Sequence, residues 1–166
     1  MAHLSTPQKS TAFFLLLSLG AILIALAFEH YGGYKPCPLC LQERYAYYAA
    51  IPLSAAAFFA LRSGNSNWAA VLIALAGSAF LLNTGLGLYH SGVEWHWWKG
   101  PTACSGASDL TPTAGNFLES LEKIKVIRCD EAPWRLLGLS FAGWNMIISF
   151  FLFLFSISIF KTLRKN

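Results

Sequence analysis

The chain has 166 residues, of which 55% are hydrophobic and only 12% charged, and its net charge is +4. A soluble domain has a charged fraction nearer a quarter, so this composition excludes an ordinary soluble protein and favours an integral membrane protein. The length leaves no room for a second soluble domain beside several spanning helices, and the modest positive charge is interpreted as a topology signal rather than as a sign of nucleic-acid binding.

Four long runs without Asp, Glu, Lys or Arg predict four membrane-spanning helices. A helix rises about 1.5 Å per residue, so roughly 17 to 25 residues cross the hydrocarbon core. The predicted spans are residues 11–29, 43–61, 67–90 and 136–160. We therefore expect one integral membrane domain over residues 1–166, an all-α fold built as a four-helix transmembrane bundle, in which small residues such as Gly77 let the helices approach closely.

The first predicted span has an alternative as a cleaved signal peptide, because Ala25-Leu26-Ala27 resembles a small-residue cleavage site. Its apolar run, however, exceeds the roughly 7 to 15 residues of a signal core. Cleavage would also leave three spans and put the two termini on opposite sides. A spanning helix is the favoured interpretation.

The distribution of basic residues predicts that both termini are cytoplasmic. In that orientation the cytoplasmic segments are about twice as dense in Lys and Arg as the two loops on the other side, residues 30–42 and 91–135. All eight acidic residues, from Glu29 to Glu131, then lie on the non-cytoplasmic side. The inverted topology fits the basic residues less well.

The long second loop, residues 91–135, is the one sizeable part outside the predicted spans. It opens with an aromatic cluster around Trp97, of the kind found at headgroup level. Further on, Asn116 and Glu119 are spaced as a helix cap, and apolar residues recur at helical spacing as far as Ile127. This short amphipathic helix either lies flat on the membrane surface or packs on the loop itself.

The four cysteines Cys37, Cys40, Cys104 and Cys129 all fall on the non-cytoplasmic side of this topology. An even number of thiols in an oxidising compartment implies disulfides, and four cysteines allow three pairings. Cys37-Pro38-Leu39-Cys40 is a C-x-x-C pair, a spacing typical of redox-active sites. The sequence therefore predicts redox chemistry at this pair.

Cys40 lies at the start of the second predicted helix, and Arg44 follows one turn later on the same face. Free amide groups at a helix N-terminus and a nearby guanidinium both favour a thiolate. We therefore expect Cys40 to be the more readily ionised cysteine of the pair.

Less specific interpretations remain open for these residues. The cysteines could form two purely structural disulfides in an accessory or assembly protein. They could bind zinc, but the spacing lacks the second close pair of a zinc site, so no metal site is predicted. Arg44 could be a snorkelling interface residue, and His90 an interfacial, hydrogen-bonded histidine.

The run from Lys35 to Arg44, the pair Tyr89-His90, and lone Cys104 and Cys129 in one external loop together resemble the DsbB family of disulfide-forming membrane oxidoreductases. The resemblance extends over nearly the whole chain. The C-x-x-C-x-x-E-R string at the head of a helix, combined with two distal cysteines, is specific.

The resemblance implies a protein thiol:quinone oxidoreductase in the bacterial inner membrane, with its cysteines facing the periplasm. Cys104 and Cys129 would form the disulfide that oxidises a soluble, DsbA-like thioredoxin-fold partner, with Cys104 as the site of the mixed disulfide. The electrons would pass to Cys37 and Cys40 by thiol–disulfide exchange, with Cys37 exchanging with Cys129. The route from DsbA through DsbB to quinone is a known periplasmic one.

By the same resemblance, Cys40 would face and reduce the bound quinone, either ubiquinone or menaquinone, and Arg44 and His90 would lie beside its ring. A positive charge or donor there can stabilise a developing anion. The rival redox class is a membrane reductase that runs electrons outward, like the vitamin K epoxide reductase proteins. Those proteins carry their C-x-x-C late in the chain, whereas here it precedes the second predicted span.

Overall fold

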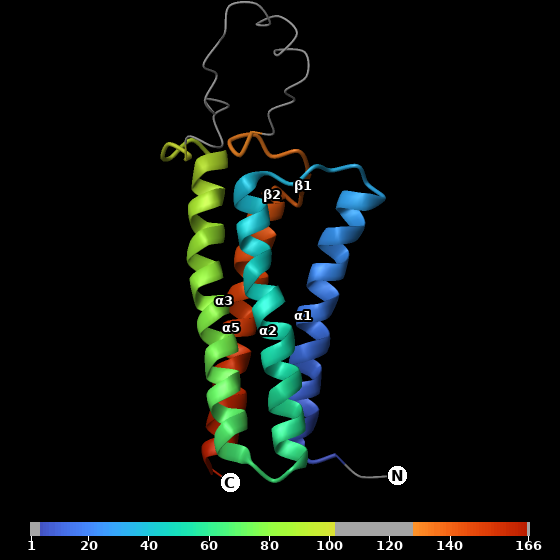
Figure 1. The fold of residues 1–166 in the computed structure, drawn as a ribbon. Coiled ribbons are helices and arrows are strands. Elements are labelled where there is room, and N and C mark those ends of the chain that lie inside the picture. The colour runs from blue at the N-terminus through green and yellow to red at the C-terminus, as the bar shows by residue number, and fades with distance from the viewer. Residues whose placement is uncertain (1–3, 102–127, 166) are drawn as a thin grey trace, which may run out of the picture.

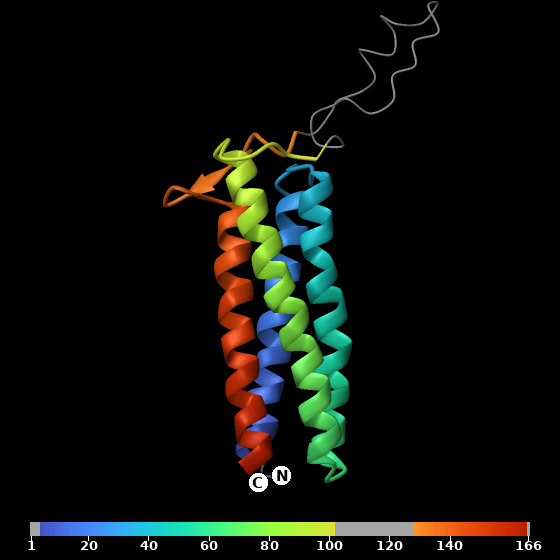
Figure 2. The ribbon, with the colours of Figure 1, turned by 90° about the vertical axis from the view of Figure 1, so that its left-hand side faces the viewer.

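The computed structural model describes residues 4–101 and 128–165. Within them, four long helices run side by side: α1 (Thr6–His30), α2 (Pro38–Arg62), α3 (Ser66–Glu94) and α5 (Phe141–Lys165). Figures 1 and 2 show the start of α1, the α2–α3 turn and the end of α5 at one end of the bundle. The predicted all-α architecture is confirmed.

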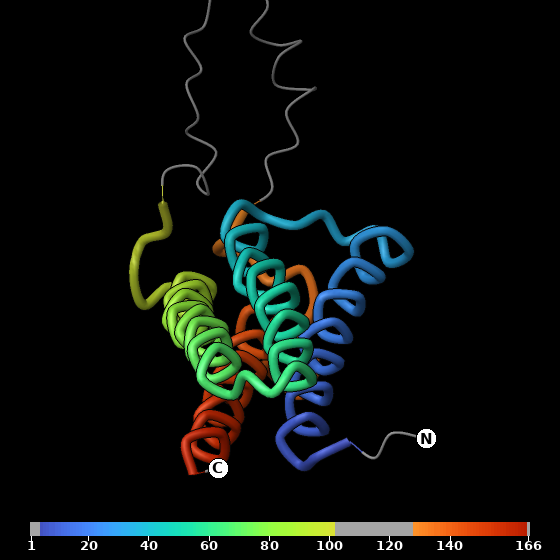
Figure 3. The backbone as a smooth tube through the Cα atoms, turned by 60° about the horizontal axis from the view of Figure 1, so that its bottom comes forward, coloured from blue at the N-terminus to red at the C-terminus, as the bar shows by residue number. Residues whose placement is uncertain are grey.

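The helices form a closed bundle. Helix α2 packs between α1 and α3, and α5 packs against α3 and α1 (Figure 3). Close approach of α3 to α5 depends on glycine, because a Cβ at Gly77 would overlap Ser156 and a Cβ at Gly87 would press on the backbone of Met146. Phe14 and Phe80 are fully buried and meet edge to face, at 5.8 Å between ring centroids, in the centre of the bundle.

Helices α1, α3 and α5 are each long and apolar enough to cross a membrane. Their outer faces carry large exposed apolar side chains, among them Leu16, Leu82 and Phe151. Exposure of such apolar surfaces is unfavourable in water but favourable in the hydrocarbon of a membrane. Helix α2 is as long as α1 but less apolar, and the length and composition criterion does not place it among the spans.

The helix boundaries differ from the predicted ones because caps and turns, rather than the ends of uncharged runs, set them. Helix α2 begins at Pro38, five residues before the predicted span, since Cys37 is its N-cap. The last predicted span was wrong in its first residues. Residues 135–140 form an antiparallel hairpin of β1 (Arg135–Leu136) and β2 (Leu139–Ser140), and its turn has positive φ at Leu137 and Gly138, as a two-residue hairpin turn requires.

Candidate functional site

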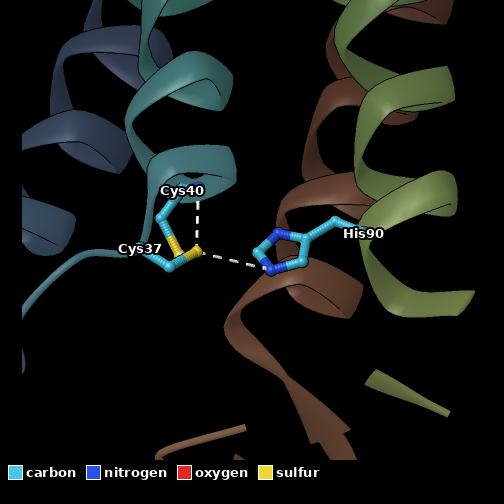
Figure 4. Close-up of side chains that lie close together, drawn as sticks. All are labelled: Cys37, Cys40 and His90. Carbon is cyan, nitrogen blue, oxygen red and sulfur yellow. Dashed lines mark hydrogen bonds between the residues drawn. The ribbon is translucent and has the colours of Figure 1, made fainter. Parts of the chain in front are cut away.

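The C-x-x-C pair lies at the end of the bundle opposite the α2–α3 turn. Cys37 is the N-cap of α2 and Cys40 is in the first turn, and both are free cysteines. The sulfur of Cys37 accepts the backbone N–H of Cys40 at 3.2 Å, and the two sulfurs are 2.7 Å apart (Figure 4). Cys37 is buried, whereas Cys40 is half-buried.

The hydrogen bonds at this pair converge on Cys37. The one from the Cys40 side chain lowers the pKa of the Cys37 thiol below its ordinary value, with a further contribution from the Cys40 backbone, and together they outweigh the effect of burial. The expectation that Cys40 is the more readily ionised cysteine is therefore wrong. That expectation placed the start of the helix at Cys40, whereas α2 begins at Pro38. The sulfur that accepts from a free amide at the helix N-terminus is therefore that of Cys37.

A pair of variants tests this assignment. Cys40→Ser keeps a hydroxyl that can donate to the Cys37 sulfur, whereas Cys40→Ala removes the donor and keeps the backbone N–H. We expect the Cys37 thiol to ionise at lower pH in Cys40→Ser than in Cys40→Ala, because a donor stabilises the thiolate. Thiolate absorbance in the ultraviolet, followed against pH, measures this difference. Identical titration curves in the two variants would contradict the assignment.

His90 reaches this pair from α3. Its Nε2 lies 3.6 Å from the sulfur of Cys37, and its Nδ1 lies 2.8 Å from the Oε1 of Glu43 (Figure 4 shows the cysteine side). Both side chains of the His90–Glu43 pair are buried, at 2% and 8% exposure. With Glu43 ionised, Nδ1 carries the ring proton and Nε2 presents its lone pair to the Cys37 thiol.

Cys37, His90 and Glu43 thus have the order of a nucleophile, a base and a carboxylate that orients the base. Histidine in this place can take the thiol proton of Cys37 and create the thiolate that disulfide exchange requires. Glu43 is the acidic residue of the C-x-x-C-x-x-E-R string, for which the sequence suggested no role. The available signal was a carboxylate three residues after Cys40 in a helix that also carries Arg44.

Arg44 does not bond to either cysteine. Its guanidinium donates to the carboxylate of Glu29 on α1, at 2.5 Å from Nη1 to Oε2, and only 12% of the Arg44 side chain is exposed. The ion pair joins α1 to α2 just below the cysteines. The role expected for Arg44 in stabilising a Cys40 thiolate has no contact to support it.

A cavity of about 680 Å³ adjoins the C-x-x-C pair. One part of its wall is polar and contains Cys40, Glu43, Arg44 and His90. The rest is mainly apolar, with side chains from α1, α5 and the segment before β1, including Ala25, Phe28, Trp134, Trp144 and Ile148. The cavity can therefore hold an apolar molecule that carries a polar group at one end.

Cys129 comes from the segment that follows the gap at residues 102–127, and it is buried beside the C-x-x-C pair. It belongs to one compact apolar cluster with Cys37, Leu39 and Val93, is 1% exposed, and is disulfide-bonded. The structure therefore brings the predicted site residues Cys37, Cys40, Cys129 and His90 to one end of the bundle. Cys104 and the predicted amphipathic helix lie outside the described residues.

A polar cluster that the sequence did not reveal continues from Glu43 into the bundle. The Tyr47 hydroxyl donates to Asn145 Oδ1 at 2.8 Å, and the Asn83 amide donates to Ser149 Oγ at 2.9 Å. These side chains come from three helices, so no spacing along the chain could have paired them. Hydrogen bonds of this kind between buried and half-buried side chains hold the three helices in a fixed arrangement beside Glu43.

Comparison with known proteins places these features in a family context. The family model described as "Disulfide bond formation protein DsbB" matches residues 7–159. The chain is 28% identical over 158 residues to "Disulfide bond formation protein B" of Marinobacter nauticus, covering 90% of this chain and 88% of that protein. It is 30% identical over 168 residues to the protein of the same name from Nitrosococcus oceani, covering 93% and 91%. No solved structure matches this chain significantly.

Proposed function

Because the chain belongs to the DsbB family of disulfide bond formation proteins, we propose that it oxidises a periplasmic, DsbA-like dithiol protein and passes the electrons to a membrane quinone. The family implies a membrane oxidoreductase that generates disulfides. The quinone, the partner and the routing of electrons through Cys37, Cys40, Cys104 and Cys129 are our proposal.

The observation that carries this proposal is the gathering of Cys37, Cys40 and Cys129 at one end of the bundle, with His90 against Cys37 and a largely apolar cavity beside the pair. Cys37 and Cys129 share one cluster, and Cys37 and Cys40 are within bonding reach of each other. Electrons can therefore move from the loop cysteine to the C-x-x-C pair over contact distances. A pair of purely structural disulfides would need no base at Cys37 and no cavity at Cys40.

The proposed relay balances in three exchanges of two electrons and two protons each. The partner dithiol reduces the Cys104–Cys129 disulfide and leaves as a disulfide. The resulting dithiol reduces the Cys37–Cys40 disulfide by thiolate attack, with Cys129 bonding to Cys37 on the way. Reoxidation of the Cys37–Cys40 dithiol then releases two electrons and two protons toward the cavity, with His90 taking the proton of Cys37.

The residues around the cavity fit a quinone. Its ring and apolar tail suit the apolar walls, and the polar side would meet Cys40, Arg44 and His90. When bound, a quinone supplies an acceptor for two electrons and two protons. The Glu29–Arg44 ion pair holds the guanidinium at the edge of this cavity, where it can donate to an oxygen that gains negative charge.

We further propose that α2 spans the membrane with the other helices and that both termini face the cytoplasm of a bacterial inner membrane. Shielding of Arg44 by Glu29 and of His90 by Glu43 lowers the cost of burying α2, since paired charges are cheaper to bury than isolated ones. The end that carries the cysteines would then lie at the periplasmic surface.

The test is turnover by the purified full chain in lipid nanodiscs. A reduced thioredoxin-fold protein and a short-chain quinone are added, and quinone reduction is followed by absorbance together with loss of thiols. We expect one quinone consumed for each pair of thiols, with separate arms for a ubiquinone and a menaquinone analogue. If folded protein leaves the thiols reduced in both arms, the proposed function fails and the accessory role with structural disulfides is favoured.

A further inference from the structure

Three metal-ligating atoms meet at the C-x-x-C pair. The two sulfurs of Cys37 and Cys40 and a ring nitrogen of His90 all lie within 4.8 Å of one another. Figure 4 shows the imidazole of His90 directed from α3 toward both sulfurs at the head of α2. Two thiolates and one imidazole are ligands that Zn²⁺ prefers, and catalytic zinc sites often use three protein ligands with a fourth position open.

The distances suit a tetrahedral cation. Zinc bonds of about 2.3 Å to sulfur and about 2.0 Å to nitrogen place a sulfur and a nitrogen ligand roughly 3.6 Å apart. The Cys37 sulfur and His90 Nε2 are 3.6 Å apart already. The two sulfurs, now 2.7 Å apart, would separate by roughly 1 Å to accommodate a cation. Cys37 precedes the helix, so rotation of its side chain can supply that movement.

The surroundings of His90 provide a second, independent observation. A histidine that binds zinc almost always donates its other ring N–H to a carboxylate or carbonyl, which fixes the ring and leaves the facing nitrogen free to ligate. Glu43 occupies that place, with Oε1 at 2.8 Å from Nδ1. The site is buried at Cys37 and His90 and opens at Cys40 toward the cavity, so a small cation has both an enclosure and an entrance.

From these observations we propose that the reduced Cys37–Cys40 pair, together with His90, binds one thiophilic divalent cation such as Zn²⁺. Binding replaces the two thiol protons, forms two metal–sulfur bonds and one metal–nitrogen bond, and moves no electrons. The Cys37–Cys40 disulfide offers no thiolate ligand, so the oxidised pair does not bind the cation. The ion would therefore occupy the dithiol form only and would block its reoxidation until a chelator removes it.

The spacing along the chain could not reveal this site. It has a single close cysteine pair, and His90 lies 53 positions after Cys37 on another helix. The absence of a second C-x-x-C argued against zinc on sequence grounds. Packing of α3 against α2 supplies the third ligand instead.

Co²⁺ binding to the full chain in detergent tests the proposal without quinone or partner, so its outcome is independent of the proposed function. The protein is reduced anaerobically with a phosphine and titrated with Co²⁺, first as wild type and then as Cys104→Ser/Cys129→Ser, which retains only the two site thiols. We expect one Co²⁺ per chain in that variant, a thiolate-to-cobalt charge-transfer band, displacement by Zn²⁺, and no band when the pair is oxidised to the disulfide before Co²⁺ is added.

Matched histidine variants decide whether His90 is a ligand. His90→Ala should weaken Co²⁺ binding by about 10-fold or more, and Glu43→Gln by about 10- to 100-fold through loss of the oriented ring. His30→Ala, at the exposed end of α1, should leave the affinity unchanged. The proposal is overturned if reduced, helical protein shows no charge-transfer band, or if His90→Ala binds Co²⁺ as tightly as His30→Ala.

Discussion

Replacing Cys37 by alanine is expected to reduce quinone-dependent dithiol oxidation to the uncatalysed rate while the helical bundle stays folded. Cys37 is the one cysteine in contact with all the other described parts of the relay: its sulfur meets Cys40 and His90, and it shares a buried cluster with Cys129. Without it, the thiolate of reduced Cys129 has no disulfide to attack, because Cys40 alone cannot form one within the pair. Steady-state quinone reduction in nanodiscs measures the loss.

The control for this prediction is Leu39→Ala. Leu39 is buried in the same cluster and the same helical turn as the pair, and its truncation removes more apolar volume than Cys37→Ala does. It should lower the free energy of unfolding by about 2 to 5 kcal/mol, as in a well-packed site. The variant should still turn over at temperatures where it is folded. Equal loss of activity in the two folded variants would show that packing, rather than the thiol, carries the effect.

The parts of this molecule that the sequence could predict are those governed by local composition. Long uncharged runs indicated the helices, and the C-x-x-C spacing of Cys37 and Cys40 placed both sulfurs at the head of one helix. The hairpin at residues 135–140 was missed because residues 136–140 are uncharged and run without a break into the apolar helix that follows. Its turn depends on positive φ at Leu137 and Gly138, which an apolar run does not signal.

Sequence patterns alone did not predict which side chains of different helices contact each other. Which residue of α3 faces Cys37 depends on the rotation and register of α2 against α3, which side-chain packing along the whole interface decides. The pairing of His90 with Glu43, and of Arg44 with Glu29, therefore emerged only in three dimensions. In both pairings a buried or half-buried carboxylate accepts a hydrogen bond from a basic side chain of the predicted site, which lowers the cost of burying its charge.

His90→Leu should lower turnover by about 10²- to 10⁴-fold, the usual range for a general base, under the proposed function. The imidazole faces Cys37 with Nε2 and is oriented by Glu43 at Nδ1, so its loss slows formation of the Cys37 thiolate. Raising the pH should restore part of the rate, because hydroxide then ionises the thiol without a base. Glu43→Gln should lower turnover in the same direction by a smaller factor, since its amide oxygen still accepts from Nδ1–H but carries no charge.

The pH profile separates this role from a structural one. A variant that only disturbs the packing of α2 against α3 would lose turnover by the same factor at every pH, whereas loss of a base gives a deficit that shrinks as pH rises through the thiol range. His30→Leu, on the exposed end of α1, supplies the matched control and should retain the wild-type profile. A pH-independent deficit in His90→Leu would assign His90 to packing and leave Cys37 to ionise through its hydrogen bonds with Cys40 alone.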